Sequence, residues 1–189
     1  MMEESHQFPC EPRILVLGIG NLLWADEGFG VRAVESFDRS YIFPDSVVLM
    51  DGGTQGLLLL PHVQESTHLL IFDAVDFGQS PGTMVLRRNE EVPAYLHSGK
   101  MSLHQTGFQE VLLLSDLLGG RPPEMALVGL QPEDWDTFGG ELTALARERI
   151  PAATDLALKV LEEWGAVPTP RPNGVSENIL FPRALLSSM

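Results

Sequence analysis

The feature that most constrains the fold is an alternation between short, unbroken apolar runs and stretches with helical spacing. Unbroken apolar runs are typical of strands that are buried on both faces of a sheet. Such runs cover residues 13–18, 46–51, 68–73 and 125–130. Helical stretches lie between them, and this order predicts an α/β domain with a mostly parallel sheet covered on both faces.

The helical stretches carry their apolar residues on one side. Residues 27–39 place Val31, Val34 and Phe37 together, and residues 105–118 do the same with a second set: Phe108, Val111, Leu112 and Leu118. Residues 141–164 form a third helical stretch. We expect it to restart at Pro151, because proline suits a first helical turn. Residues 83–88 alternate more and end in two arginines, which predicts an edge strand.

The length of 189 residues fits one well-packed domain. From about residue 165 the composition shifts to proline, asparagine and serine. We therefore predict a flexible N-terminal segment at 1–12, a single domain at 13–165 and a C-terminal tail at 166–189.

Charge and cysteine content exclude several classes of protein. The net charge of −14 is opposite to that of a nucleic-acid binder and does not suit an anionic membrane surface. The single cysteine, Cys10, excludes an internal disulfide and a cysteine-rich zinc site. No run reaches the roughly 20 apolar residues of a membrane span. We expect a cytoplasmic protein that binds neither nucleic acid nor membrane.

In parallel sheets of this class the ligand lies beyond the carboxyl ends of the strands. Glu27 opens the helix after the first strand, whereas Asp51 and Asp73 end the next two strands. His104 is expected in a loop just before a helix that starts near Gln105. These four side chains should therefore gather at one edge of the sheet.

The loop GIGNLLWADEGFG at 18–30 invites a comparison with phosphate-binding loops. A dinucleotide fingerprint needs a third glycine where this chain has Leu23. Asp26 and Glu27 would also repel a phosphate at the start of the helix. Asp51 lies farther along than the usual ribose-binding acid, so we do not favour nucleotide binding.

Familiar hydrolytic nucleophiles are also missing from the sequence. It contains no G-x-S-x-G elbow and no H-E-x-x-H motif, and Cys10 lies in a segment expected to be a tail. A hydrolase of this sequence would need another source of nucleophile.

Two carboxylates and one imidazole are ligands suited to a divalent transition-metal ion. Each also has a structural explanation. A Glu in a first helical turn is favoured by the helix dipole, an Asp at a strand end often caps a turn, and a loop His is commonly a surface residue. The segment DGGTQG at 51–56 has two explanations as well. Its paired glycines fit either a tight turn or the close approach of a bound chain, and Asp51, Gly52, Gly53 and Thr54 are its candidate substrate-binding residues.

Several separate motifs, in the right order, resemble the [NiFe]-hydrogenase maturation endopeptidases, particularly the branch that serves membrane-bound uptake hydrogenases. The resemblance covers residues 13–165. The motifs are GIGNLLWADEGFGVR, DGGTQG, LLIFDAVDFG, PGT at 81–83, KMSLHQ at 100–105 and LVGLQP at 127–132.

This resemblance implies a fold, an activity and a site. The fold would be a three-layer α/β/α arrangement around a twisted, mostly parallel, five-stranded sheet. The activity would be an aspartic-type, nickel-dependent endopeptidase. It would remove the C-terminal extension of the hydrogenase large-subunit precursor, after a basic residue, once nickel has been inserted. The metal-contacting positions would be Glu27, Asp73 and His104, and the nickel would arrive with the substrate, with no permanent metal in the protein.

From these residues we expect metal-assisted hydrolysis, in which a cation polarises the scissile carbonyl or activates a water. Either carboxylate could serve as general base, so Glu27, Asp73 and His104 are also the candidate catalytic residues. The large-subunit precursor is the expected partner, with other hydrogenase maturation chaperones as further partners. The alternative is a non-catalytic factor that binds the large subunit and checks its metal.

Overall fold

The computed structural model describes residues 12–96 and 103–172, and leaves out the side chains of residues 94–96 and 103–106. The expected flexible segment at 1–12 lies outside this part except for its last residue, as do residues 173–189 of the expected tail. The described residues form a five-stranded sheet with the order β3-β1-β4-β6-β5. The strands are β1 Ile14–Ile19, β3 Val47–Gly53, β4 His68–Ala74, β5 Met84–Arg88 and β6 Glu124–Leu130.

All five strands expected from the sequence are present. β3, β1, β4 and β6 run parallel, and β5 joins the edge beside β6 in the antiparallel direction. The mostly parallel α/β class and the edge position of residues 83–88 are both confirmed.

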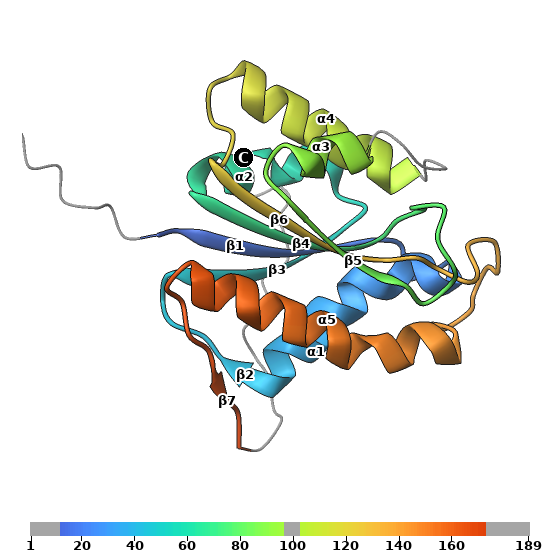
Figure 1. The fold of residues 1–189 in the computed structure, drawn as a ribbon. Helices are drawn as coiled ribbons and strands as arrows, with labels where there is room; N and C mark the ends of the chain where they lie inside the picture. The colour runs from blue at the N-terminus through green and yellow to red at the C-terminus, as the bar shows by residue number, and fades with distance from the viewer. Residues whose placement is uncertain (1–11, 97–102, 173–189) are drawn as a thin grey trace, which may run out of the picture.

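Helices cover both faces of the sheet, as Figure 1 shows. The helices α1 Phe29–Ser40 and α5 Ala144–Glu163 pack on one face. The helices α2 Leu60–Glu65, α3 Glu91–Leu96 and α4 Leu103–Leu117 pack on the other. Each face has its own apolar core, because successive side chains of a strand point to opposite faces. In β4, for example, Leu70 and Phe72 belong to the core under α1, whereas Leu69 and Ile71 belong to the core under α4.

Two short 3₁₀ turns precede helices at the carboxyl ends of strands: η1 Ala25–Gly28 before α1, and η2 Gly56–Leu59 before α2. A glycine fixes how closely α1 approaches the sheet. A Cβ at Gly30 would lie 2.2 Å from the carbonyl oxygens of both Ile19 and Phe72. The first turn of α1 therefore rests directly on the ends of β1 and β4, which brings η1 to the edge of the sheet where the site was expected.

Some expectations about helices are wrong in detail. α5 does not restart at Pro151 but runs through it, and Pro151 is exposed, so water can satisfy the carbonyl that loses its helical partner. Leu118 lies one residue beyond α4 and is 64% exposed, so it does not join Phe108, Val111 and Leu112 in the core. His104 lies in the first turn of α4 rather than in a loop before it.

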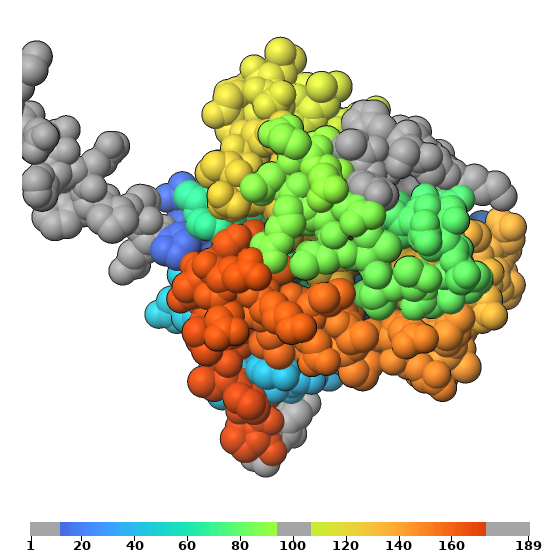
Figure 2. All heavy atoms as spheres, viewed as in Figure 1, coloured from blue at the N-terminus to red at the C-terminus, as the bar shows by residue number. Residues whose placement is uncertain are grey.

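The first residues after position 165 pack against the domain. Ala166 is buried in the core under α1, and β7 Thr169–Pro170 pairs antiparallel with β2 Tyr41–Ile42. The space-filling view in Figure 2 shows this last described segment continuing from α5 at the lower edge of the molecule. In Figure 1 the first described residues and β7 lie on the left, and the carboxyl ends of the parallel strands point to the right.

Candidate functional site

The adjacent carboxylates Asp26 and Glu27 have different environments. Asp26 is completely buried and accepts hydrogen bonds from the backbone N–H groups of Glu133 at 2.9 Å and Asp134 at 3.2 Å. It also accepts from the N–H of Thr143 at 2.8 Å and from its hydroxyl at 3.1 Å. Asp26 thus anchors η1 to the segment 132–143, and the partly exposed Glu27 remains at the edge of the sheet.

The segment 132–143 is held against the loop after β1 by backbone contacts as well. The Gly139 N–H donates to the Leu23 carbonyl at 2.8 Å, and the Ala25 N–H donates to the Thr137 carbonyl at 3.1 Å. Trp24 and Phe138 form an isolated antiparallel bridge between these contacts. The loop that carries Glu27 is therefore supported on two sides, by α1 and by this segment.

Asp73 lies in β4, opposite Gly129 of β6, and is completely buried. Strand alternation assigns its side chain to the face of Leu69 and Ile71, which α4 covers. Burial of a carboxylate is costly and is a recurrent property of functional sites. η1 contacts β4, so the elements that carry Glu27 and Asp73 meet at this edge of the sheet.

His104 belongs to the first turn of α4, but its side chain lies outside the described residues. The position of that turn is restrained by two glycines. A Cβ at Gly107 would lie 3.5 Å from the Cα of Gly56, at the start of η2. The amino end of α4 therefore begins beside the loop that follows β3, on the same face as the Asp73 side chain.

Asp51 lies on the other face of the sheet from Asp73. Its alternate neighbours Val47 and Leu49 belong to the core under α1, so Asp51 is directed toward that helix. Burial raises the pKa of the Asp51 carboxyl, Glu35 raises it further, and a hydrogen bond from the Gly53 N–H and the charge of Arg32 lower it. Asp51 and Asp73 therefore lie at the same edge of the sheet but on opposite faces.

The glycines after Asp51 form a tight turn that leads into η2. The Gln55 N–H donates to the Gly52 carbonyl at 2.9 Å, and Gly53 has a positive φ of 42°. The Gly20 N–H donates to the Gly53 carbonyl at 3.1 Å, which joins this turn to the loop after β1. Thr54 is exposed beside it. The structural explanation of DGGTQG is thus correct, and a role of Asp51, Gly52, Gly53 and Thr54 in substrate binding stays a prediction.

The sequence did not single out Gln131 as an organiser of the site. Its side-chain oxygen accepts from the Phe77 N–H at 2.7 Å and the Gln79 N–H at 3.2 Å, and its amide donates to Asp76 at 3.2 Å. A Cβ at Gly129 would lie 2.4 Å from the Phe77 ring, so this glycine makes room for the loop. The signal was the motif LVGLQP, which places both residues at the end of a predicted strand.

Among the side chains that the structure describes, no three His, Cys, Asp or Glu residues form a group able to hold a metal ion. His104 is not among those side chains, so the three-residue set is not tested. In the described ranges 12–96 and 103–172, no helix has the length and apolarity needed to cross a membrane.

Comparisons with known proteins point to one family. The profile of the hydrogenase maturation protease family matches residues 31–160, a stretch that includes Asp73 and His104 and begins after Glu27. The hydrogenase expression/formation protein HupD of Rhizobium leguminosarum bv. viciae is 54% identical over 168 residues, which cover 89% of this chain and 83% of that protein.

Solved structures agree. The hydrogenase maturating endopeptidase HybD from Escherichia coli superposes with a TM-score of 0.79 and 42% identity, covering 84% of this chain and 98% of that one. The [NiFe] hydrogenase maturation protease HybD from Thermococcus kodakarensis has a TM-score of 0.65 and 26% identity, covering 78% and 98% of the two chains. The three-layer fold and the peptidase activity expected from the sequence are those of these relatives. This chain belongs to the hydrogenase maturation protease family.

Proposed function

We propose that this protein is the endopeptidase that removes the C-terminal extension of a [NiFe]-hydrogenase large-subunit precursor after nickel has been inserted. The observation that carries the proposal is the fully buried carboxylate of Asp73, at the sheet edge where η1 and α4 begin, in a chain of the maturation protease family. The names of its relatives, a hydrogenase maturating endopeptidase among them, support a hydrogenase precursor as substrate.

In this proposal nickel is part of the substrate. Glu27, Asp73 and His104 contribute two carboxylates and an imidazole, a donor set that suits a divalent transition-metal ion. They would complete the coordination of an ion that the precursor already holds, so a precursor without nickel would lose these contacts. Each tenfold loss of affinity corresponds to about 1.4 kcal/mol.

The proposed chemistry is metal-assisted hydrolysis of the peptide bond, in which the cation polarises the carbonyl or activates water. A carboxylate that accepts a proton from that water would act as general base, and Glu27 and Asp73 are the two candidates. Asp26 is not a candidate, because hydrogen bonds to 132–143 occupy both of its carboxylate oxygens. We place this reaction in the cytoplasm, with other hydrogenase maturation chaperones as further partners.

The first test is cleavage of purified large-subunit precursor. Mass spectrometry of its C-terminus should show a shortened product only when this protein and nickel-loaded precursor are both present. His104→Ala should reduce the cleavage rate by about a hundredfold or more, because it removes a proposed metal contact. Full activity on nickel-free precursor, or binding of loaded precursor without any cleavage, would contradict the proposal.

His62→Ala is a matched control for His104→Ala. His62 lies in α2 beside Arg13, Val48 and Glu65, which line a cavity of about 240 Å³ at the amino ends of β1 and β3. This cavity is at the end of the sheet opposite the candidate site. The control variant should therefore cleave nickel-loaded precursor at the wild-type rate.

A further inference from the structure

Four large apolar residues precede or adjoin η1, and we name them the apolar rim: Leu22, Leu23 and Trp24 are consecutive in the chain, and Phe138 pairs with Trp24 in an antiparallel bridge. Leu22 is 40% exposed, Leu23 56% and Phe138 68%, and Trp24 is half-buried. Single exposed apolar residues are common on protein surfaces, but a contiguous group is typical of an interaction site. The rim begins directly before Ala25, the first residue of η1, and so adjoins the element that carries Glu27.

The apolar rim is held in a fixed arrangement. The rings of Trp24 and Phe138 pack edge to face, with centroids 5.2 Å apart. The backbone bonds from Gly139 to Leu23 and from Ala25 to Thr137 flank this pair, and the buried Asp26 ties both segments together. A partner that binds here meets a surface that is already ordered, so binding costs less conformational entropy.

The charge around the apolar rim is negative. Residues 14–31 and 122–143 contain no Lys, Arg or His, whereas 132–143 carries four acids beside the rim: Glu133, Asp134, Asp136 and Glu141. Hydrogen bonds from the Thr137 hydroxyl and the backbone of Asp136 and Thr137 lower the pKa of Asp134, which keeps that carboxylate ionised. Arg147 of α5 approaches Glu141 at 3.4 Å but leaves the segment negative in sum.

We propose that the apolar rim binds the segment of the precursor that flanks the scissile bond, with apolar side chains of this segment on the rim and the basic residue expected at the cleavage site beside the four acids. This inference rests on the proposed function and adds where the peptide chain of the substrate is held. The occupant follows from charge complementarity, and from continuity of the rim with η1. Apolar contacts would supply affinity, and the four acids would favour a basic segment and accelerate its association.

The test compares kinetics of Leu23→Ser, Phe138→Ser and the double variant on nickel-loaded large-subunit precursor. The double variant should raise KM about tenfold or more while kcat changes less than twofold, because the rim does not touch the reacting atoms. Asp136→Asn should lower the association rate, and its difference from wild type should vanish in 0.5 M salt because ionic screening is then strong.

Leu113→Ser and Leu117→Ser in α4 are matched controls, since these leucines are 67% and 77% exposed on another surface. The controls should leave KM unchanged, and circular dichroism should show that all variants fold. An unchanged KM in the double rim variant, or an equal rise in the controls, would overturn the inference. A rim variant that loses self-association while its KM stays normal would also overturn it, by showing that a second copy is the occupant. Failure of the wild-type protein to cleave would refute the proposed function instead, so the two failures are distinguishable.

Discussion

At the scale of single residues, the two acids that follow the glycine-rich turn, Asp26 and Glu27, have different environments. Asp26 accepts four hydrogen bonds from the segment 132–143, whereas Glu27 is partly exposed at the edge of the sheet. The sequence predicts that this pair does not serve phosphate binding through a dinucleotide fingerprint, and this stays a prediction. It could not separate the two roles, because the donors to Asp26 lie more than 100 residues away in the chain.

Asp51 provides a test of residue-scale electrostatics. The pKa of Asp51 is raised above its ordinary value of 3.8, so the folded state binds this proton more tightly than the unfolded state does. The contribution of Asp51 to stability is therefore fully present below pH 3.8 and is lost as the pH rises through the folded-state pKa. Asp51→Asn should raise the free energy of unfolding at pH 7, and this gain should shrink toward zero near pH 3. Urea unfolding at several pH values measures it.

Asp45→Asn is the control for this prediction, because Asp45 is exposed and also contributes to the net charge of −14. Loss of any negative charge reduces self-repulsion, so only the difference between the two variants reports the local environment of Asp51. Equal gains in both variants, or a gain for Asp51→Asn that persists at pH 3, would contradict the assignment.

At the scale of elements, the tie between η1 and the segment 132–143 determines whether Glu27 has a fixed position. Asp26→Ala leaves three N–H groups and one hydroxyl without their acceptor, at a cost of about 3–5 kcal/mol in the free energy of unfolding. For a chain of this size we expect the melting temperature to fall by about 10 °C. The same variant should cleave precursor more slowly even at temperatures where it is fully folded.

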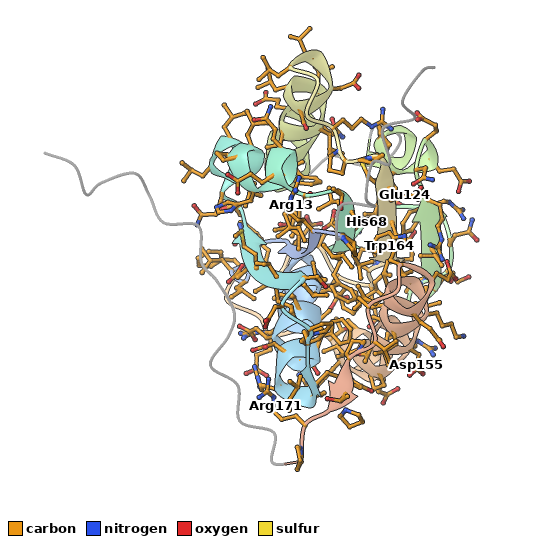
Figure 3. All side chains as sticks on the ribbon, turned by 90° about the vertical axis from the view of Figure 1, so that its left-hand side faces the viewer. Arg13, His68, Glu124, Asp155, Trp164 and Arg171 are labelled. Carbon is orange, nitrogen blue, oxygen red and sulfur yellow. The ribbon has the colours of Figure 1, made fainter. Side chains whose placement is uncertain are left out.

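Asp155→Ala serves as the comparison for Asp26→Ala, since Asp155 is exposed on α5, as Figure 3 shows. Its melting temperature should stay within about 2 °C of wild type, as is usual for surface substitutions. If differential scanning calorimetry gave the same melting temperature for both variants, the anchoring role of Asp26 would be wrong.

Element types were predictable because the strands are continuous apolar runs and the helical faces repeat with the right period. The errors occur where tertiary contacts or solvent exposure determine the boundary of an element or the face on which a side chain lies. Pro151 is accommodated inside α5 because it is exposed, and α4 begins before His104, a boundary that no local residue marks. The face of the sheet on which Asp51 lies depends on the register of β3. Pairing within the sheet sets that register, with Asp51 opposite Gly18.

At the scale of the whole molecule, residues 166–172 cover the carboxyl end of α1. Arg171 lies at that end in Figure 3, where its guanidinium donates to the carbonyls of Tyr41 at 2.9 Å and Asp38 at 3.3 Å. It also lies 4.0 Å from the buried carboxylate of Asp38. A cation at the carboxyl end of a helix is favoured by the helix dipole. The composition from about residue 165 onward, which is rich in proline and asparagine, predicted a tail. It gives no signal for the few residues here that pack against the domain.

Arg171→Ala should lower the free energy of unfolding by about 1–3 kcal/mol, since it removes two hydrogen bonds and the charge opposite Asp38. Arg171→Lys should recover part of this loss, because it keeps the charge without the two-pronged geometry of the guanidinium. Arg149→Ala, at an exposed position of α5, should change stability by less than about 0.5 kcal/mol. Equilibrium unfolding in urea separates these cases, and identical midpoints for Arg171→Ala and wild type would refute the contact.

The arrangement of the ends of the described chain has a practical consequence. The first described residues and β7 lie on one side of the molecule, and the strand ends with η1 lie on the other, as Figure 1 shows. A surface tether fixed beside β7 would hold the protein with its apolar rim turned outward to a large incoming complex. Immobilised in this orientation, the protein would suit capture measurements with an intact hydrogenase subunit.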